Sequence, residues 1–245
     1  MDMFHSLDLK EGGWRRDDHI QHPNGVRPRV VVISTFNAKY AGIADAAKEN
    51  WKAYCKHNGY ALRWYPGHYH EDPTRPHTYG DKGKFEIYYD IRGQADYVMF
   101  LDIDSLFMNF SVRVDEKMRG GKKFWYTYDE SGPLSGLWIA ATDDATETRL
   151  RKVYEYAAMT NNVRWGKVEP NGISDQDAMR ALIAVPPFRD LLQHCYPATE
   201  AGHTFPETYR EGSWIIGFPG CSVAEKLALM RVWSAKERES RGVAV

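Results

Sequence analysis

Cysteine is scarce in this sequence, which limits how the chain could be cross-linked or bind zinc. Three cysteines, Cys55, Cys195 and Cys221, are spread over 245 residues. An odd and widely spaced set forms neither a disulfide framework nor the ligand pairs of a zinc site. A reducing compartment is therefore the expected environment.

Long hydrophobic runs are also absent. No stretch of 18 apolar residues occurs, and residues 1–29 are polar, without an apolar core after the first Met. A membrane-spanning helix needs a run of that length, and a secretory leader needs a shorter apolar core near the N-terminus. We expect a soluble protein in the cytoplasm or another intracellular compartment, with no membrane segment.

An excess of charge of one sign is missing too. Lys and Arg number 32 against 33 Asp and Glu, the formal net charge is -1, and the basic residues form no cluster. Because a phosphate backbone is bound largely through clustered Lys and Arg, nucleic acid is not expected to be a partner. Small molecules or glycans fit this composition better.

What the sequence does contain is the strand and helix pattern of an α/β protein. Strands are expected at residues 29–34, 60–65, 97–101, 123–127 and 134–141. Helices are expected at residues 40–55, 81–92, 143–159 and 222–230. We predict an N-terminal arm at 1–28, one domain at 29–233 and a charged C-terminal tail at 234–245.

Two carboxylates, Asp102 and Asp104, come directly after the apolar run 97–101. Ligands gather at the carboxyl ends of buried strands in open α/β sheets, and residues i and i+2 of an extended segment point the same way. The pair could therefore hold one hard divalent cation, with water and phosphate oxygens as its other ligands. A solvated turn after a strand is the alternative, because short motifs recur by chance.

Other candidate ligand contacts lie at the end of the first strand and on a later helix. Thr35, Phe36 and Asn37 follow the first strand, Tyr40 comes next, and a nucleotide base commonly binds at this edge of an α/β sheet. Lys84, in the first turn of the helix at 81–92, could fold back beside a diphosphate. A solvated charge is the alternative for that lysine.

Three histidines, His68, His70 and His77, lie in the Pro-rich stretch 66–80. Such a set could ligate a transition metal. The Pro-rich composition instead favours a solvated loop or one that faces an acceptor.

Two later segments have the spacing of a helix start. Ser174 and Asp177 form a capping-box pattern, which explains these two residues without any chemistry but leaves Asp175 and Gln176 unexplained. Residues 222–225 repeat the pattern and predict the start of another helix.

Taken in this order, the motifs resemble metal-dependent glycosyltransferases of the GT-A fold over residues 29–232. Within that fold the sequence is most similar to the retaining galactosyl- and mannosyltransferase family, which includes fungal α-mannosyltransferases and plant xyloglucan xylosyltransferases. Glycogenin-like transferases, which share the Asp-Gln-Asp motif, are its neighbours. The resemblance implies a single Rossmann-like α/β domain with a mixed central sheet.

The resemblance also implies an activity, namely retaining transfer of a sugar from a UDP- or GDP-sugar to a hydroxyl of a glycan, glycoprotein or other acceptor. Asp104 would bind Mn²⁺ or Mg²⁺, and Asp102 would bind the metal or the donor ribose. Gln176 or Asp175 would face the anomeric carbon. Thr35 to Tyr40 would bracket the base, and Lys84 would contact the diphosphate.

Three further positions are matched less closely. The family has Asn-Ser-Gly where this chain has Leu134-Ser135-Gly136, so Ser135 is the implied sugar contact. Gly220 fits the family motif His-Phe-x-Gly-Cys, but Gly217 stands where that motif has its metal-binding His. Extra waters, a replacement ligand such as His203, or a weakened activity would follow.

Two other functions compete with transfer. Phosphatases of the haloacid dehalogenase type also carry Asp-x-Asp after an apolar strand, with the first Asp as nucleophile. Their strand usually opens the domain and continues to a Thr, whereas here a strand-helix-strand unit comes first and Leu106 takes the place of the Thr. A non-catalytic sugar- or nucleotide-binding protein on a decayed transferase fold is the second alternative, which Gly217 favours.

Overall fold

The computed structural model of the protein describes the chain in segments. They are residues 28–66, 88, 91, 93–118, 123–129, 132–148, 150, 162–164, 167–169, 176, 179–180, 192–195 and 202–243. The predicted arm, Lys84, Asp175 and the histidines of the 66–80 stretch lie outside the described residues. So do most of the predicted helices at 81–92 and 143–159.

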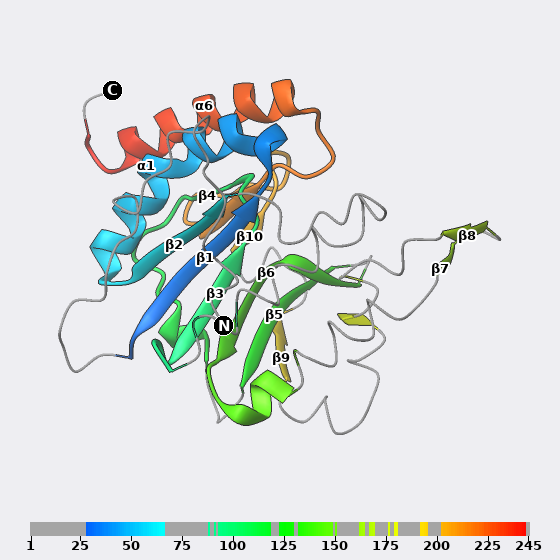
Figure 1. Ribbon diagram of the computed structural model, residues 1–245. Helices are drawn as coiled ribbons and strands as arrows, with labels where there is room; N and C mark the ends of the chain where they lie inside the picture. The colour runs from blue at the N-terminus through cyan, green and yellow to red at the C-terminus, as the bar shows by residue number, and fades with distance from the viewer. Residues whose placement is uncertain are drawn as a thin grey trace.

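A six-stranded mixed sheet forms the centre of the molecule (Figure 1), in the order β2-β1-β3-β6-β5-β9. The strands are β1 Val30–Phe36, β2 Ala61–Pro66, β3 Tyr97–Leu101, β5 Phe124–Asp129, β6 Gly132–Ala141 and β9 Leu192–Cys195. β1 pairs in parallel with β2 and β3, whereas β6 is antiparallel to both β3 and β5. The predicted mixed sheet is confirmed.

Both faces of this sheet are buried, and alternate residues of β1 show why residues 30–33 are continuously apolar. Val30 and Val32 belong to the cluster that includes the adjacent helix, while Val31 and Ile33 belong to the cluster on the other face. A strand covered on both sides favours apolar residues, and the buried Ser34 donates its hydroxyl to the carbonyl of Leu101 (2.7 Å). The prediction of buried strands at 29–34 and 97–101 is confirmed.

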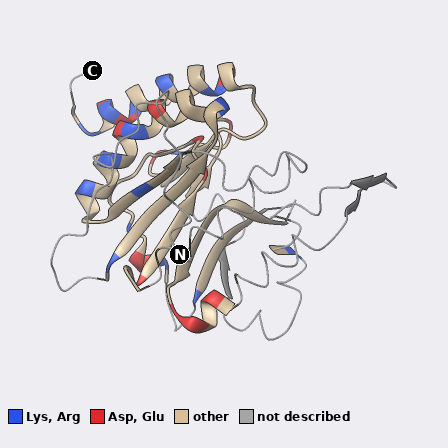
Figure 2. Ribbon diagram, viewed as in Figure 1, with Lys and Arg blue, Asp and Glu red and all other residues tan. Residues whose placement is uncertain are grey.

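Two helices, α1 Ala41–Asn58 and α6 Val223–Ser240, pack against each other on one face of the sheet (Figure 1). α1 continues beyond the predicted residue 55 to Asn58, at the Asn58-Gly59 pair, because Gly59 adopts a φ of 72° that terminates the helix. Figure 2 shows that the charged residues lie mainly along these helices and not along the central strands. No helix in the described part of the chain is long and apolar enough to cross a membrane.

α6 is longer than predicted. Its predicted end was Met230, but the helix continues through the charged segment to Ser240. Trp233 and Glu237 are both buried there, and the Glu237 carboxylate pairs with Arg241. Part of the predicted tail is therefore an ordered continuation of the helix.

Smaller elements complete the fold. A three-stranded sheet joins β10 His203–Thr204, β11 Ile215–Gly217 and β4 Ser105–Phe107, with β11 in the middle. A separate hairpin pairs β7 Asn162–Arg164 with β8 Lys167–Glu169. Short 3-10 turns, η2 Ala38–Tyr40 and η3 Asp115–Lys117, follow β1 and precede β5 respectively.

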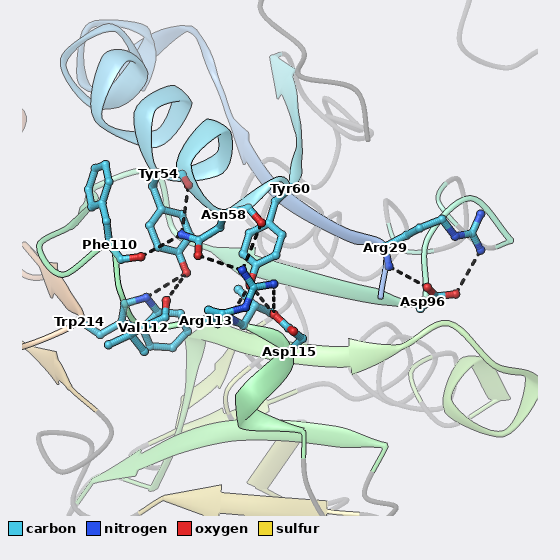
Figure 3. A network of polar contacts seen from close by, with 11 residues as sticks. Arg29, Tyr54, Asn58, Tyr60, Asp96, Phe110, Val112, Arg113, Asp115 and Trp214 are labelled. Carbon is cyan, nitrogen blue, oxygen red and sulfur yellow. Dashed lines mark hydrogen bonds and ion pairs between the residues drawn. The ribbon is translucent and has the colours of Figure 1, made fainter. Parts of the chain in front are cut away.

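A buried polar network holds the segment after β4 against the C-terminal half of α1 (Figure 3). Asn58 donates a hydrogen bond to the carbonyl of Phe110 (3.0 Å), and the Tyr54 hydroxyl donates to the carbonyl of Val112 (2.8 Å). The Trp214 indole N–H donates to the Tyr54 hydroxyl (3.2 Å). The chain after β4 and the residue before β11 are thus fixed to one helix.

The same network contains an ion pair. Asp115 accepts a hydrogen bond from the Tyr60 hydroxyl (2.6 Å) and pairs with Arg113 (2.9 Å). Burial raises the pKa of the Asp115 carboxyl, but the hydrogen bonds from Tyr60 and Arg113 outweigh it and leave the pKa below its ordinary value. Burial also raises the pKa of Tyr60. The network therefore holds a charged carboxylate beside a neutral phenol.

Candidate active site

The two predicted metal-binding aspartates lie in a turn between β3 and β4. β3 ends at Leu101 and β4 begins at Ser105. The backbone N–H of Asp102 donates to the carbonyl of Gly136 (2.8 Å), and the N–H of Phe218 donates to the carbonyl of Asp104 (3.0 Å). We call residues 102–104 the acidic turn, and its backbone is held from both sides.

Side chains of α1 hold β4 on the edge that β11 leaves open. The Asn50 amide donates to the Phe107 carbonyl (2.8 Å), and its oxygen accepts from the Phe107 N–H (2.8 Å), as a neighbouring strand would. The Trp51 indole donates to the carbonyl of Ser105 (2.8 Å). Because unpaired backbone groups are costly when buried, these contacts make a three-residue strand a stable support for the acidic turn.

Asp104 forms an ion pair with Lys226 in the first turn of α6. Both side chains are largely buried, with exposed fractions of 17% for Asp104 and 9% for Lys226. The Lys226 ammonium also lies 5.8 Å from the centre of the Tyr40 ring. Lys226, which was not predicted from the sequence, therefore links the acidic turn to the predicted base-binding edge.

A signal for Lys226 was present in the sequence. The positive end of the helix dipole lies at the N-terminus, so a cation in the first turn is unfavourable there. Ser222 and Glu225 form the predicted capping box, which fixes that turn, and Lys226 follows directly. A lysine just after a recognisable helix cap is therefore a weak signal for an acidic partner, and the sequence alone does not say which one.

The residues predicted to bracket a base lie at the end of β1, with different surroundings. Thr35 donates its hydroxyl to the Tyr65 carbonyl (3.3 Å), and Phe36 is buried, with its ring edge-on to Trp64 at 6.0 Å. The side-chain oxygen of Asn37 is buried and has no hydrogen-bond partner among the described residues. Asn37 thus has an unused acceptor, which a ligand could reach once the side chain turns outward.

The Asp102 carboxylate lies against the α-carbon of Gly136 on β6. A Cβ atom built on Gly136 would be 2.5 Å from Oδ2 of Asp102, closer than real Cβ contacts allow. Ser135, the predicted sugar contact, is the adjacent residue on β6 and is buried. The Ser-Gly pair therefore lies at the acidic turn, and its glycine makes room for the Asp102 side chain.

Gly217, where the resemblance expects a histidine, pairs with Ser105 at the start of β4. A Cβ on Gly217 would lie 3.5 Å from both Nε2 of His203 and Oγ of Ser105, which is ordinary contact. His203 is buried on β10, and its Nδ1 lies 3.2 Å from the Thr127 hydroxyl. The imidazole of His203 thus faces the space in which a side chain at position 217 would begin.

The donor set of the acidic turn suits a hard cation, because Asp102 and Asp104 supply the carboxylate oxygens that Mg²⁺ and Mn²⁺ prefer. Within the described residues, however, no group of three His, Cys, Asp or Glu side chains is close enough to hold a metal ion. Water or substrate oxygens would have to complete the shell unless His203 moves closer. His203 as third ligand stays a prediction.

Of the other predicted site residues, the structure describes Gln176 and Gly220. Gln176 is helical and half-buried, while its predicted partner Asp175 lies outside the described residues, as does Lys84. Gly220 has a φ of 73° in the exposed turn between β11 and α6, a conformation that favours glycine. The structure therefore accounts for Gly220 as a turn residue without assigning it a ligand.

Solved structures similar to this chain are glycosyltransferases, although no protein-family profile and no curated protein sequence matches it. A glycosyltransferase involved in glycosylation of the major capsid of PBCV-1 superposes with a TM-score of 0.62 at 14% identity, over 84% of this chain and 100% of that one. Galactosyltransferase LgtC, in complex with donor and acceptor sugar analogues, gives 0.53 at 10% identity, over 82% and 95%. Streptococcus pneumoniae TIGR4 glycosyltransferase GlyE gives 0.50 at 13%, over 88% and 64%. The chain therefore has the mixed α/β architecture of GT-A glycosyltransferases.

Proposed function

We propose that the protein is a glycosyltransferase that moves a sugar from a nucleotide-diphosphate sugar to an acceptor hydroxyl, with retention and with the help of a divalent cation. The observation that carries this proposal is the position of the acidic turn. Asp102 and Asp104 follow a central strand, beside the polar end of β1, in a fold shared with known glycosyltransferases. Ligands of open α/β sheets bind at such strand ends.

The donor base would bind at the end of β1. The buried, unused oxygen of Asn37 would accept a hydrogen bond from an N–H group of the base, as uracil and guanine both carry. Tyr40, half-buried on η2, would contact the ring. A UDP- or GDP-sugar satisfies both contacts.

Asp102 and Asp104 would hold Mn²⁺ or Mg²⁺, with water, diphosphate oxygens or His203 completing the shell. The cation would neutralise the charge that develops on the leaving diphosphate. Lys84 would assist the same group, and Asp102 would otherwise bind the donor ribose. Ser135, beside Asp102 at the acidic turn, would contact the donor sugar or the acceptor.

Gln176 is the reason for proposing that the anomeric configuration of the sugar is retained. A glutamine cannot take a proton at neutral pH, but its amide oxygen can stabilise the positive charge that develops on the sugar ring. Asp175 would flank the same carbon. One of the similar structures is an active-site mutant of LgtC in which a glutamine is replaced by glutamate, so that protein has a glutamine in its active site.

The phosphatase alternative is not favoured by the topology. β1, α1 and β2 all precede β3, so the acidic turn follows the third strand of the chain and not the first. A non-catalytic binding protein would bind the same donor without turnover. Only an experiment can distinguish it from the proposed enzyme.

A thermal-shift screen of UDP- and GDP-sugars, with and without Mn²⁺, tests the proposed function. A ligand that binds the native state raises the melting temperature by mass action, so the correct donor should raise it most in the presence of Mn²⁺. That donor should then be hydrolysed slowly without acceptor and consumed faster with one. Preferred hydrolysis of phosphomonoesters would identify a phosphatase, and binding without any turnover would identify a binding protein.

Gly136→Ala should lower donor turnover by roughly 100-fold, because small misplacements of a catalytic constellation cost about that much. The new methyl group would meet the Asp102 carboxylate at 2.5 Å and force it to rotate. Stability should change little, since β6 is extended at this position and alanine is compatible with a strand. Steady-state turnover and thermal denaturation would be measured together.

Gly42→Ala is the matched control for that substitution. A Cβ on Gly42 would meet the Leu227 side chain at 3.8 Å, an ordinary contact, so neither turnover nor fold should suffer. Wild-type turnover in Gly136→Ala would show that the position of the Asp102 carboxylate is unimportant.

A further inference from the structure

Lys226 occupies a position that helix formation does not explain. It lies in the first turn of α6, directly after the capping box of Ser222 and Glu225. A positive charge there opposes the helix dipole, and the capping contacts are complete without it. Its charge must therefore be stabilised by something other than its own helix.

The partner of Lys226 is the second carboxylate of the acidic turn. The Lys226 side chain is 9% exposed and that of Asp104 is 17% exposed, so both charges are largely withdrawn from water. Burying an ammonium ion is costly unless an opposite charge compensates it, and Asp104 supplies that charge. The electron-rich face of Tyr40, 5.8 Å from the ammonium, adds a weaker attraction.

This pairing uses the carboxylate that the proposed function requires for a divalent cation. A carboxylate already paired with an ammonium attracts a second cation less strongly, because the two positive charges repel each other at short range. The ammonium must leave Asp104, or share it, before a cation can bind there with full strength.

We propose that Lys226 is a built-in counter-ion of Asp104, which neutralises the carboxylate in the metal-free protein and which a divalent cation must displace. The inference rests on the proposed role of the acidic turn in cation binding. It adds that Lys226 competes with the cation for Asp104 and thereby lowers the cation affinity of this turn. Lys226 is thus a positioning residue that acts through Asp104.

The test is direct titration of the protein with Mn²⁺ alone, followed by electron paramagnetic resonance of the free ion, with no donor present. Lys226→Gln should bind Mn²⁺ about tenfold more tightly than the wild type, since removing the competing partner of a largely buried ion pair is worth about one factor of ten. Its melting temperature should also rise more on addition of Mn²⁺ than that of the wild type.

Lys236→Gln is the matched control. Lys236 lies on the same helix, is exposed and contacts the Trp233 ring at 4.0 Å, so its loss removes the same charge away from the acidic turn. Its Mn²⁺ affinity should equal that of the wild type. An increase of the same size in both variants would mean that overall charge, and not Lys226, sets the affinity, and the inference would be overturned.

Lys226→Arg tests the idea without removing the charge. A guanidinium binds a carboxylate through two parallel hydrogen bonds, so this variant should bind Mn²⁺ no more tightly than the wild type. Unchanged affinity in Lys226→Gln, or tighter binding in Lys226→Arg, would overturn the inference. If Lys226→Gln does not fold, Lys226→Met, which also removes the charge, takes its place and should show the same gain in Mn²⁺ affinity. Absence of Mn²⁺ binding in every variant would instead refute the proposed cation site itself.

Discussion

Asp104→Asn should abolish cation-dependent binding of the nucleotide-diphosphate donor while the protein stays folded. A hard divalent cation binds through charged carboxylate oxygens, and an amide of the same shape supplies no charge. We expect donor affinity in the presence of Mn²⁺ to fall by about 100-fold or more, since several kcal/mol of charge stabilisation correspond to at least two factors of ten. Calorimetric titration with donor, first with Mn²⁺ and then with a chelator, measures the effect.

Two hydrogen bonds of residue 104 should persist in this variant. Its asparagine oxygen can still accept a hydrogen bond from Lys226, so α6 should keep its contact with the acidic turn. The carbonyl of residue 104 still accepts from the Phe218 N–H, which depends on no side chain. The buried Lys226 ammonium nevertheless loses its compensating charge, so a clear fall in melting temperature is expected even though these hydrogen bonds keep the fold.

Asp45→Asn provides the control for Asp104→Asn. Asp45 is exposed on α1, and its substitution removes the same charge from the surface. Donor affinity should stay at the wild-type value. If Asp104→Asn also binds donor as well as the wild type, and chelator has no effect on either protein, the acidic turn holds no cation that matters for the donor.

The parts of the fold that local sequence determines could be predicted. Residues 30–33 of β1 and 97–101 of β3 are apolar because both faces of the sheet are covered, and α1 ends before Gly59 because the left-handed conformation there suits glycine. The capping box at Ser222 was likewise readable from spacing alone. Each of these features depends on neighbours within a few residues.

What could not be predicted depends on contacts between distant segments. β4 has three residues and is a strand only because β11 pairs with one edge while Asn50 and Trp51 satisfy the other. The ion pair of Asp104 with Lys226 spans 122 positions of the chain. A single sequence gives the chemistry of such residues but not their distance, so the aspartates were found and their lysine was not.

The length of α6 shows a related limit. Residues 234–245 are rich in charge, which favoured a charged tail instead of a continued helix. Trp233 packs against Tyr209, with ring centres 4.7 Å apart, and Glu237 is buried with its Arg241 partner. Tertiary packing thus stabilises a helix that its composition alone would not.

Gln176→Ala should lower the rate of sugar transfer much more than it lowers donor affinity. The amide oxygen of Gln176 is proposed to stabilise positive charge that is present on the sugar ring only as the bond to the diphosphate breaks. Removing an interaction made mainly in the transition state lowers kcat and kcat/KM together and leaves KM nearly unchanged. A fall in kcat of about 100-fold to 1,000-fold is the expected size for the loss of one such group.

Gln94→Ala is the matched control for this substitution. Gln94 accepts a hydrogen bond from Arg63 (2.6 Å) at the exposed start of β3, away from the acidic turn. Its loss should leave both kcat and KM near their wild-type values. Equal losses of kcat in the two variants would point to a general effect on stability and not to a role at the anomeric carbon.

The stereochemistry of the product tests the same assignment independently. An inverting enzyme needs a carboxylate or histidine as general base on the face opposite the leaving group, whereas a retaining enzyme can use the departing phosphate as the base. Because glutamine cannot act as that base, the proposed place of Gln176 beneath the sugar implies same-face attack. An α-linked donor should therefore give an α-linked product, which proton NMR of the anomeric signal would show. A β signal would refute both retention and the role given to Gln176, while a cation at Asp102 and Asp104 would stand unaffected.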